Sequence, residues 1–236
     1  MIPLKDENPT SSTPVVTVVL IVICVAVFAF VQPRPSRDIS GTERNLRFTY
    51  ETAAIPCEVT KGRPLDLDEI RQGLRGDDQA CQDSSDGDAP FPAKNVYLAV
   101  LYSMFLHGSW LHLGGNMLFL WVFGNNIEDR KGKVVYLIFY LLAGLAATAA
   151  HILVQPDSTV PVVGASGAIA GVMGAYLVLY PNVRIRSLII LGFFVMFRDV
   201  AAKWLLGIWL VSQFFINPNE GVAWVAHIGG FVFGAG

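Results

Sequence analysis

Long apolar runs alternate with short polar connections along this chain of 236 residues. A helix needs about 20 mostly apolar residues to cross the roughly 30 Å of hydrocarbon in a bilayer, where its backbone hydrogen bonds must be internal. Six runs are candidates for such helices, over residues 14–32, 108–126, 133–154, 165–180, 201–216 and 222 onward. The apolar stretch from Ile185 to Phe197 is expected to form an additional interfacial or re-entrant piece. The pattern therefore predicts an all-α polytopic membrane protein with six transmembrane helices.

The basic residues predict the orientation of these helices, because short cytoplasmic loops are enriched in Lys and Arg. They follow the second and fourth runs, as Arg130, Lys131, Lys133, Arg184, Arg186, Arg198 and Lys203. Residues 1–13 are then cytoplasmic, and the helix over 14–32 is expected to be a retained anchor because no cleavage site follows it. Residues 33–107 form a long extracytoplasmic loop, and 108–236 form the helical core. The last run stops at Gly236 after too few residues to span, which favours a longer natural chain.

Composition agrees with a membrane protein, since 53% of the residues are hydrophobic and only 15% are charged. A net charge of -2 gives no support to nucleic-acid binding, which uses a basic face. Two of the three cysteines, Cys57 and Cys81, lie in the 33–107 loop. They could pair as a disulfide if that loop faces an oxidising compartment.

Four polar side chains inside the apolar runs are candidates for chemistry, because such groups are costly in hydrocarbon. They are His112 and Asn116 in the second run, Ser166 in the fourth and His227 in the sixth. At about 1.5 Å of rise per residue, all four lie about 5 to 12 Å below the outer face of the bilayer. This shared depth predicts one buried site that is open to the outer aqueous phase.

These residue types suit acyl transfer. A serine hydroxyl becomes a nucleophile when a neighbouring base takes its proton, and histidine is the usual base, so Ser166 and His227 form the candidate dyad. Asn116, His112 and the backbone N–H of Ser166 are candidate donors to an oxyanion. No acidic residue is available at this depth as a third member, and no cofactor is needed. The other histidines, His107 and His151, belong to no Cys, His and carboxylate cluster of metal-site type.

Glycines provide a reason why the dyad could form, because small residues let helix backbones approach closely. They lie on the fourth and sixth runs, as Gly164, Gly167, Gly171, Gly174, Gly230 and Gly234. Each polar residue taken alone has a plainer interpretation. Ser166 is typical of a helix-packing serine, and His227 or Asn116 could be interhelical hydrogen-bonding residues. The residues from Glu128 to Lys131 are interpreted as a solvated loop, and the interfacial His107 and His151 are assigned no role.

Three segments together resemble the signatures of rhomboid proteases: GASGAIAG at 164–171, AHIGG at 226–230 with Gly234 beyond it, and HLGGN at 112–116. The resemblance covers five of the six predicted helices. It implies Ser166 as nucleophile, His227 as general base, and His112 with Asn116 as oxyanion side chains. It also implies that Gly164, Gly167 and Gly171 surround the nucleophile, and that Ala226, Gly230 and Gly234 give a close helix contact. Glu128 matches a glutamate that follows the second helix in that family.

The resemblance further implies that the substrates are single-span membrane proteins, cut within or just outside the hydrocarbon near small and helix-weakening residues. Two departures stand out. Some members carry an aromatic residue four positions after the serine that stacks on the base, whereas Ala170 is found here. Some members also carry a Trp-Arg pair before the second helix, which residues 91–106 lack.

The resulting expectation is a protease of the cell membrane whose cavity is capped by loops that include residues 217–221, with the fifth helix as a lateral gate. One alternative is a catalytically inactive relative that binds membrane clients, although such a relative is expected to lack Ser166 or His227. A small transporter or channel is a second alternative. It is disfavoured because no Asp, Glu, Lys or Arg lies in the middle of any predicted helix.

Overall fold

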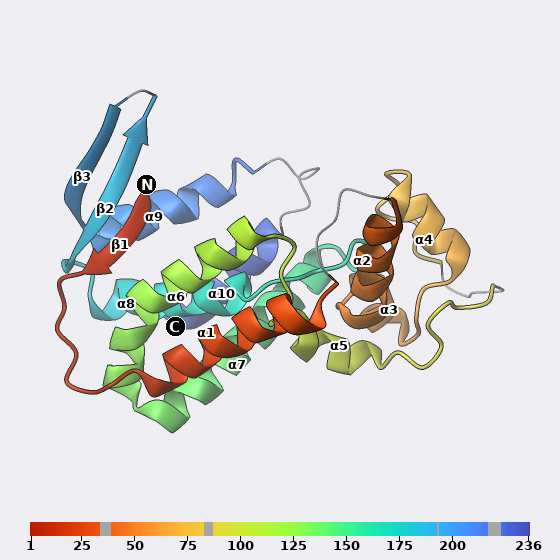
Figure 1. The fold of residues 1–236 in the computed structure, drawn as a ribbon, viewed down its shortest axis with the longest axis horizontal. Helices are drawn as coiled ribbons and strands as arrows, with labels where there is room; N and C mark the ends of the chain where they lie inside the picture. The colour runs from red at the N-terminus through yellow and green to blue at the C-terminus, as the bar shows by residue number, and fades with distance from the viewer. Residues whose placement is uncertain (34–38, 83–86, 193, 217–222) are drawn as a thin grey trace.

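The computed structural model describes residues 1–33, 39–82, 87–192, 194–216 and 223–236 as a helical bundle with a small sheet at one end (Figure 1). At the opposite end of the bundle lies a group of short helices. The elements in chain order are β1 Ile2–Asp6, α1 Val15–Ala26, the π-helix η1 Val27–Val31, α2 Ile39–Thr52, α3 Pro56–Lys61, α4 Leu67–Leu74, α5 Val96–Ser103, α6 Trp110–Lys131, α7 Lys133–Val154, α8 Ser166–Leu179, β2 Arg184–Leu191, β3 Phe194–Ala201, α9 Ala202–Gln213 and α10 Trp224–Ala235.

Each of the six predicted apolar runs is helical over most of its described length, as α1 with η1, α6, α7, α8, α9 and α10. Within the residues that the structure describes, α7 is the one helix long and apolar enough to cross a bilayer by length and composition alone. The helices Val15–Val31, Ser166–Leu179 and Trp224–Ala235 are apolar but shorter.

Helix α8 forms the centre of the bundle, and every residue from Gly167 to Tyr176 is buried. The glycines of α10 that pack on it face backbone rather than side chains. A Cβ atom added to Gly230 of α10 would overlap the carbonyl of Gly167, and one added to Gly234 would overlap the backbone of Gly171. Only glycine allows the two helices to approach this closely. The predicted role of the glycines in helix contact is therefore consistent with this packing.

The segment from Glu128 to Lys131 was expected to be a solvated loop, and this prediction is wrong. These residues form the last turn of α6, and the side chain of Glu128 is only 1% exposed. Its carboxylate accepts hydrogen bonds from the backbone N–H groups of Val16 and Thr17 at 2.9 and 2.8 Å. The N–H groups of a first helical turn have no intrahelical acceptor, so Glu128 caps α1.

The prediction of an all-α fold is wrong, because the apolar stretch expected to be an interfacial or re-entrant piece, from Ile185 to Phe197, contributes to two β-strands. Strands β2 and β3 pair antiparallel, with Arg184 opposite Ala201 and Leu188 opposite Phe197. Strand β1 adds antiparallel to β2, so the sheet order is β1-β2-β3. Most of the residues in this stretch are β-branched, aromatic or leucine, and these types suit a pleated strand.

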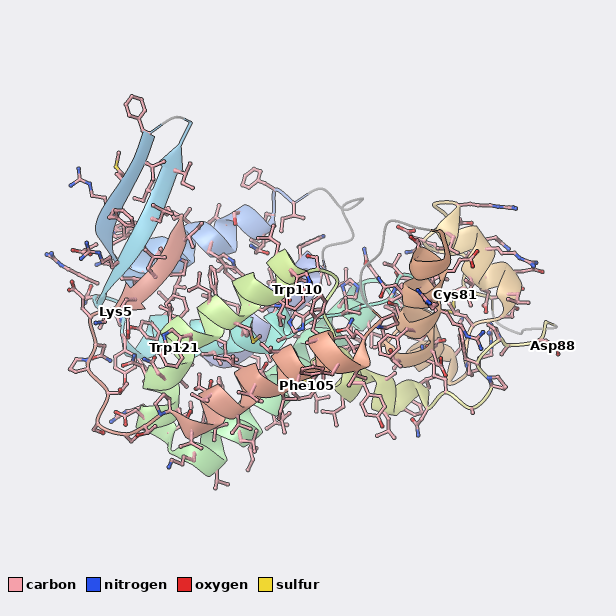
Figure 2. All side chains as sticks on the ribbon, viewed as in Figure 1. Lys5, Cys81, Asp88, Phe105, Trp110 and Trp121 are labelled. Carbon is pink, nitrogen blue, oxygen red and sulfur yellow. A yellow bond between two sulfur atoms is a disulfide. The ribbon has the colours of Figure 1, made fainter. Side chains whose placement is uncertain are left out.

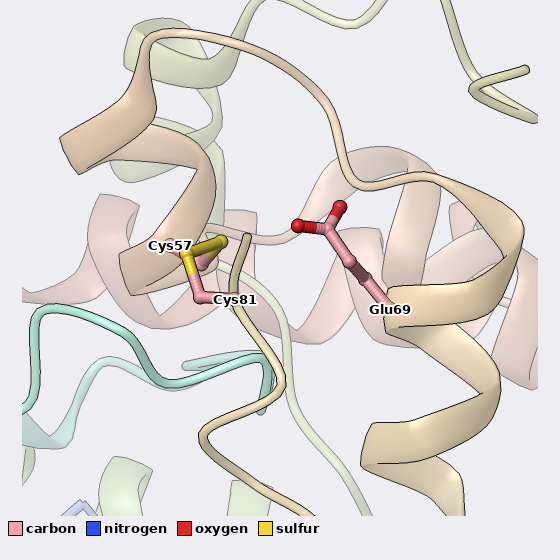
Figure 3. Close-up of side chains that lie close together, drawn as sticks. All are labelled: Cys57, Glu69 and Cys81. Carbon is pink, nitrogen blue, oxygen red and sulfur yellow. A yellow bond between two sulfur atoms is a disulfide. The ribbon is translucent and has the colours of Figure 1, made fainter. Parts of the chain in front are cut away.

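The part of the 33–107 loop that the structure describes contains helices α2 to α5 and a small core of its own, formed by Tyr50, Ile55, Cys57 and Leu65. Figure 2 shows Cys81 and Asp88 at this end of the molecule, opposite Lys5 in the sheet. The predicted pairing of Cys57 with Cys81 is confirmed, since the two sulfur atoms form a disulfide (Figure 3). We call residues 50–82 the disulfide subdomain.

The disulfide subdomain is joined by backbone hydrogen bonds to the connection between α7 and α8. The N–H of Cys57 donates to the carbonyl of Ser158 at 3.0 Å, and the N–H of Thr159 donates to the carbonyl of Asp78 at 2.9 Å. Because α8 begins a few residues later, these bonds hold the subdomain against the entrance to the central helix.

Candidate active site

Ser166 and His227 lie together where α8 and α10 begin. Ser166 is the first residue of α8, and His227 lies in the first turn of α10. The Nε2 atom of His227 is 2.8 Å from the Oγ atom of Ser166, although the residues are 61 positions apart in the chain. This is a hydrogen bond of ordinary length between a hydroxyl and a base. The contact depends on the glycine packing of α8 against α10, which brings the two helix starts together.

His112 borders Ser166 across Gly164, which adopts a positive φ of 127°. A Cβ atom on Gly164 would lie 2.9 Å from the Cε1 and Nε2 atoms of His112 and 3.5 Å from the Oγ atom of Ser166. Position 164 therefore requires glycine for both its backbone angle and its space. The backbone N–H of Gly108 donates to the Nδ1 atom of His112 at 3.3 Å. Neutral His112 must then carry its proton on Nε2, the atom that faces Gly164.

Asn116 lies four residues after His112 on α6, so the two side chains share one helix face. Asn116 is 8% exposed, and its Nδ2 atom has no hydrogen-bond partner among the residues that the structure describes. Buried amide groups are usually satisfied, and an unsatisfied one calls for an explanation. An N–H donor held without an acceptor is what a group that binds a transient oxyanion requires.

The four predicted residues line one cavity of about 860 Å³. Its walls come from α6, α7, α8, α9, α10 and the connection between α7 and α8. The disulfide subdomain supplies Asp78 and Gln79. Apolar side chains of the wall are Leu111, Phe119, Val160, Val162, Val163, Ile169, Met173 and Trp209. A polar reacting centre with an apolar wall has the chemistry of a site for a peptide segment with apolar side chains.

The start of α8 contributes backbone donors as well. The first N–H groups of a helix have no intrahelical acceptor, and the helix dipole favours negative charge at this end. The N–H of Ser166 belongs to this first turn. Together with the Nε2–H of His112 and the Nδ2–H of Asn116, it gives the cavity wall three N–H donors. Among the cavity-lining residues in the described ranges, Asp78 is the only carboxylate.

Three further residues of this site are absent from the set predicted from sequence. The Nδ1 atom of His227 is 2.7 Å from the Oε1 atom of Gln213, and the ring of Trp209 lies 6.0 Å from the ring of His227. His151, expected to be an interfacial residue without a role, is 7% exposed and lines the cavity. Gln213 had a detectable signal, because it is a polar residue inside the fifth apolar run.

Ala170, four residues after Ser166, is fully buried, and no aromatic ring is supplied from that position. The ring beside His227 comes instead from Trp209 on α9. The expected capping loop, residues 217–221, lies outside the described residues. Cys57, Glu69 and Cys81 cluster closely enough to suggest metal ligands, but the two sulfur atoms are consumed in the disulfide (Figure 3).

Residues 94–236 match the family model described as the Rhomboid domain. Rhomboid-like protein 11, chloroplastic, from Arabidopsis thaliana is 33% identical over 115 residues, which cover 48% of this chain and 40% of that protein. Presenilin-associated rhomboid-like protein, mitochondrial, from Homo sapiens is 31% identical over 151 residues, covering 61% and 38%. Rhomboid protease GluP from Bacillus subtilis is 36% identical over 85 residues, covering 36% and 16%. The matched region thus spans less than half the length of each of these relatives.

Proposed function

Since this chain belongs to the rhomboid family of helical membrane proteins, we propose that it is an intramembrane serine endopeptidase that cuts transmembrane segments of other membrane proteins. The observation that carries the proposal is the 2.8 Å hydrogen bond between Ser166 and His227 inside the cavity. One relative, GluP of Bacillus subtilis, is named a rhomboid protease. The same family match supports substrates that lie in the bilayer.

In the first half of the proposed reaction, the Oγ atom of Ser166 attacks a peptide carbonyl carbon. The Nε2 atom of His227 takes the hydroxyl proton, and the carbonyl oxygen becomes an oxyanion. The Nε2–H of His112, the Nδ2–H of Asn116 and the N–H of Ser166 are the proposed donors to that oxyanion. His227 then gives its proton to the leaving amine, and the C–N bond breaks to leave an acyl-enzyme.

In the second half, water takes the place of the amine. His227 accepts a proton from this water, whose oxygen attacks the acyl carbon, and the proton passes to the Oγ atom of Ser166 as the ester bond breaks. Apart from the substrate, this water is the one reactant that the chain does not itself supply. Water must therefore enter the cavity, and the polar residues Asp78, Gln79 and Gln155 in its wall support such an entrance.

We propose that α1 with η1, α6, α7, α8, α9 and α10 all cross the bilayer, with the sheet on the cytoplasmic side and the disulfide subdomain outside. A disulfide suits an oxidising compartment, which supports this orientation. We propose the cell membrane as the location, although two of the relatives carry chloroplastic or mitochondrial in their names. Cysteine-accessibility labelling of a Lys5→Cys variant in intact cells and in lysed cells tests the orientation.

The test of the activity uses the protein purified in detergent, treated with a serine-reactive fluorophosphonate and analysed by intact mass. We expect wild type to gain one adduct, and we expect Ser166→Ala and His227→Ala to gain none. Ser187→Ala is the matched control, because Ser187 is a buried serine outside the cavity and should not affect labelling. If folded wild type stays unlabelled, the alternative of an inactive rhomboid-like protein that binds membrane clients replaces the protease.

A further inference from the structure

Gln213 is the last residue of α9, and its side chain points into the bundle, where it is 4% exposed. Its Oε1 atom is 2.7 Å from the Nδ1 atom of His227, the ring nitrogen that does not face Ser166. A polar side chain in an apolar helix thus contacts the back of the proposed base. The relationship has the geometry of a third group that orients a histidine.

The amide of Gln213 has a defined direction. Its Nε2 group donates to the carbonyl of Trp209 at 3.1 Å and to the Oγ atom of Ser212 at 3.3 Å. Because the NH₂ group donates to two residues of α9, the amide oxygen is the atom that faces His227. A carboxamide oxygen accepts hydrogen bonds and cannot donate them, so the Nδ1 atom of His227 must carry the proton.

This proton assignment decides what the other ring nitrogen can do. Neutral imidazole carries one N–H, so a proton on Nδ1 leaves a lone pair on Nε2. That lone pair faces the Oγ atom of Ser166 at 2.8 Å, which is the arrangement a general base requires. The opposite tautomer would present an N–H to the serine and could not accept its proton.

Trp209, which also belongs to α9, lies beside the ring of His227. Its indole lies 6.0 Å from the ring of His227 at an interplanar angle of 41°, and it stacks on Phe231 of α10. The amide of Gln213 limits rotation of the imidazole about its long axis, and the indole limits tilting. Both constraints on the base therefore come from α9, while the base itself belongs to α10.

We propose that Gln213 is the positioning residue of the site, which holds His227 in the Nδ1–H tautomer and turns its Nε2 lone pair toward Ser166. The catalytic consequence rests on the proposed protease function, whereas the tautomer does not. When Ser166 gives its proton to Nε2, the imidazolium keeps its Nδ1–H, and Gln213 accepts that hydrogen bond throughout without taking a proton. The arrangement is a Ser166–His227–Gln213 series that uses a neutral amide where many serine hydrolases use a carboxylate.

The direct test is nuclear magnetic resonance of the protein labelled with ¹⁵N-histidine, because protonated and unprotonated ring nitrogens have well-separated ¹⁵N shifts. The chain has four histidines, so the signal of His227 is identified by its loss in His227→Asn. Wild type at neutral pH should show a protonated Nδ1 and an unprotonated Nε2. A protonated Nε2 in wild type would overturn the proposal, whether or not the protein is a protease.

The second test uses Gln213→Met, which keeps a similar volume but cannot accept the hydrogen bond. We expect its ¹⁵N spectrum to show a mixture of tautomers. Its rate constant for fluorophosphonate labelling should fall about 10- to 100-fold, less than the roughly 10²- to 10⁴-fold that a general base contributes, because His227 itself remains. Val211→Ala is the matched control, because Val211 is on the same helix and 56% exposed. An unchanged tautomer in folded Gln213→Met would refute the positioning role. If wild type is not labelled at all, only the proposed protease function is refuted.

Discussion

The carboxylate of Glu128 accepts two hydrogen bonds from Thr17, one from its backbone N–H and one from its hydroxyl, each at 2.8 Å. The bonds join the end of α6 to the first turn of α1. Both residues are buried, so the carboxylate has few other partners to replace them. The carboxylate of Glu128 can be buried because N–H groups of the first turn of α1 donate hydrogen bonds to it.

Replacing Glu128 with Ala should therefore destabilise the protein strongly. Three donors of Val16 and Thr17 would lose their acceptor, and we expect a loss of about 2 to 4 kcal/mol of unfolding free energy. Thermal unfolding in detergent, followed by tryptophan fluorescence, measures the effect. Asp129→Ala is the control, because Asp129 bonds to Ser11 and Ser12 in solvent and should matter much less. Equal shifts for both variants would contradict the capping role.

Asn116 and Asn126 lie on the same helix and should respond oppositely to substitution. Asn116→Ala removes an amide that has no described partner, so stability should hold while the labelling rate falls about 10²- to 10³-fold, as for an oxyanion donor. Asn126 bonds to Asp6 and Asn8, so Asn126→Ala should lower the melting temperature and leave labelling intact in the folded fraction. A normal labelling rate in Asn116→Ala would remove it from the site.

Gly230→Ala should separate α10 from α8. The added methyl group would overlap the carbonyl of Gly167, and a backbone group cannot turn away as a side chain can. We expect a cost of about 1 to 3 kcal/mol in stability together with slower labelling, because the same displacement draws His227 away from Ser166. Gly207→Ala on α9 has open space around the new atom and serves as the comparison. The prediction fails if Gly230→Ala labels at the wild-type rate.

The disulfide subdomain should become less stable as the pH falls. Burial raises the pKa of Glu69, but the hydrogen bonds from Arg63 and from two backbone N–H groups outweigh it, so the net pKa lies below the ordinary value. A group with a lowered folded-state pKa stabilises above its unfolded pKa, about 4.3 for glutamate, and this stabilisation is lost as pH falls through the folded value.

We therefore expect phosphine reduction of the Cys57–Cys81 disulfide to accelerate, relative to Glu69→Gln, as pH falls below about 4. Glu69→Gln cannot titrate and should already be reduced quickly at neutral pH. Reduction is followed by mass after thiol alkylation. A constant ratio between wild type and Glu69→Gln from pH 6 to pH 3 would contradict this account of the subdomain.

The convergence of Ser166, His227, His112 and Asn116 on one site was predictable because helix rise converts sequence position into depth, and equal depth brings buried polar groups to one level. Gln213 obeys the same rule, but its depth says nothing about which ring nitrogen it contacts. The direction of an amide depends on local bonds such as the one to the Trp209 carbonyl.

The two wrong predictions, for Glu128 and for residues 185–197, also have physical causes. Charge suggested that Glu128 lies in solvent, and only the tertiary contact with α1 supplies donors that allow it to be buried. Hydrophobicity identified residues 185–197 as apolar, but the hairpin arises from pairing between β2 and β3, with β1 added from the distant N-terminus. The pairing of β1 with β2 joins residues 2–6 to residues 185–188 and therefore has no local signature along the chain.

The bond between Gln213 and His227 makes the position of α9 matter to a residue of α10. Any outward displacement of α9 would carry Gln213 and Trp209 away from His227 together, so the ring would lose both contacts at once. Under the proposed function, a transmembrane substrate that displaced α9 on entry would therefore meet a base without its orienting groups until α9 returned to its place.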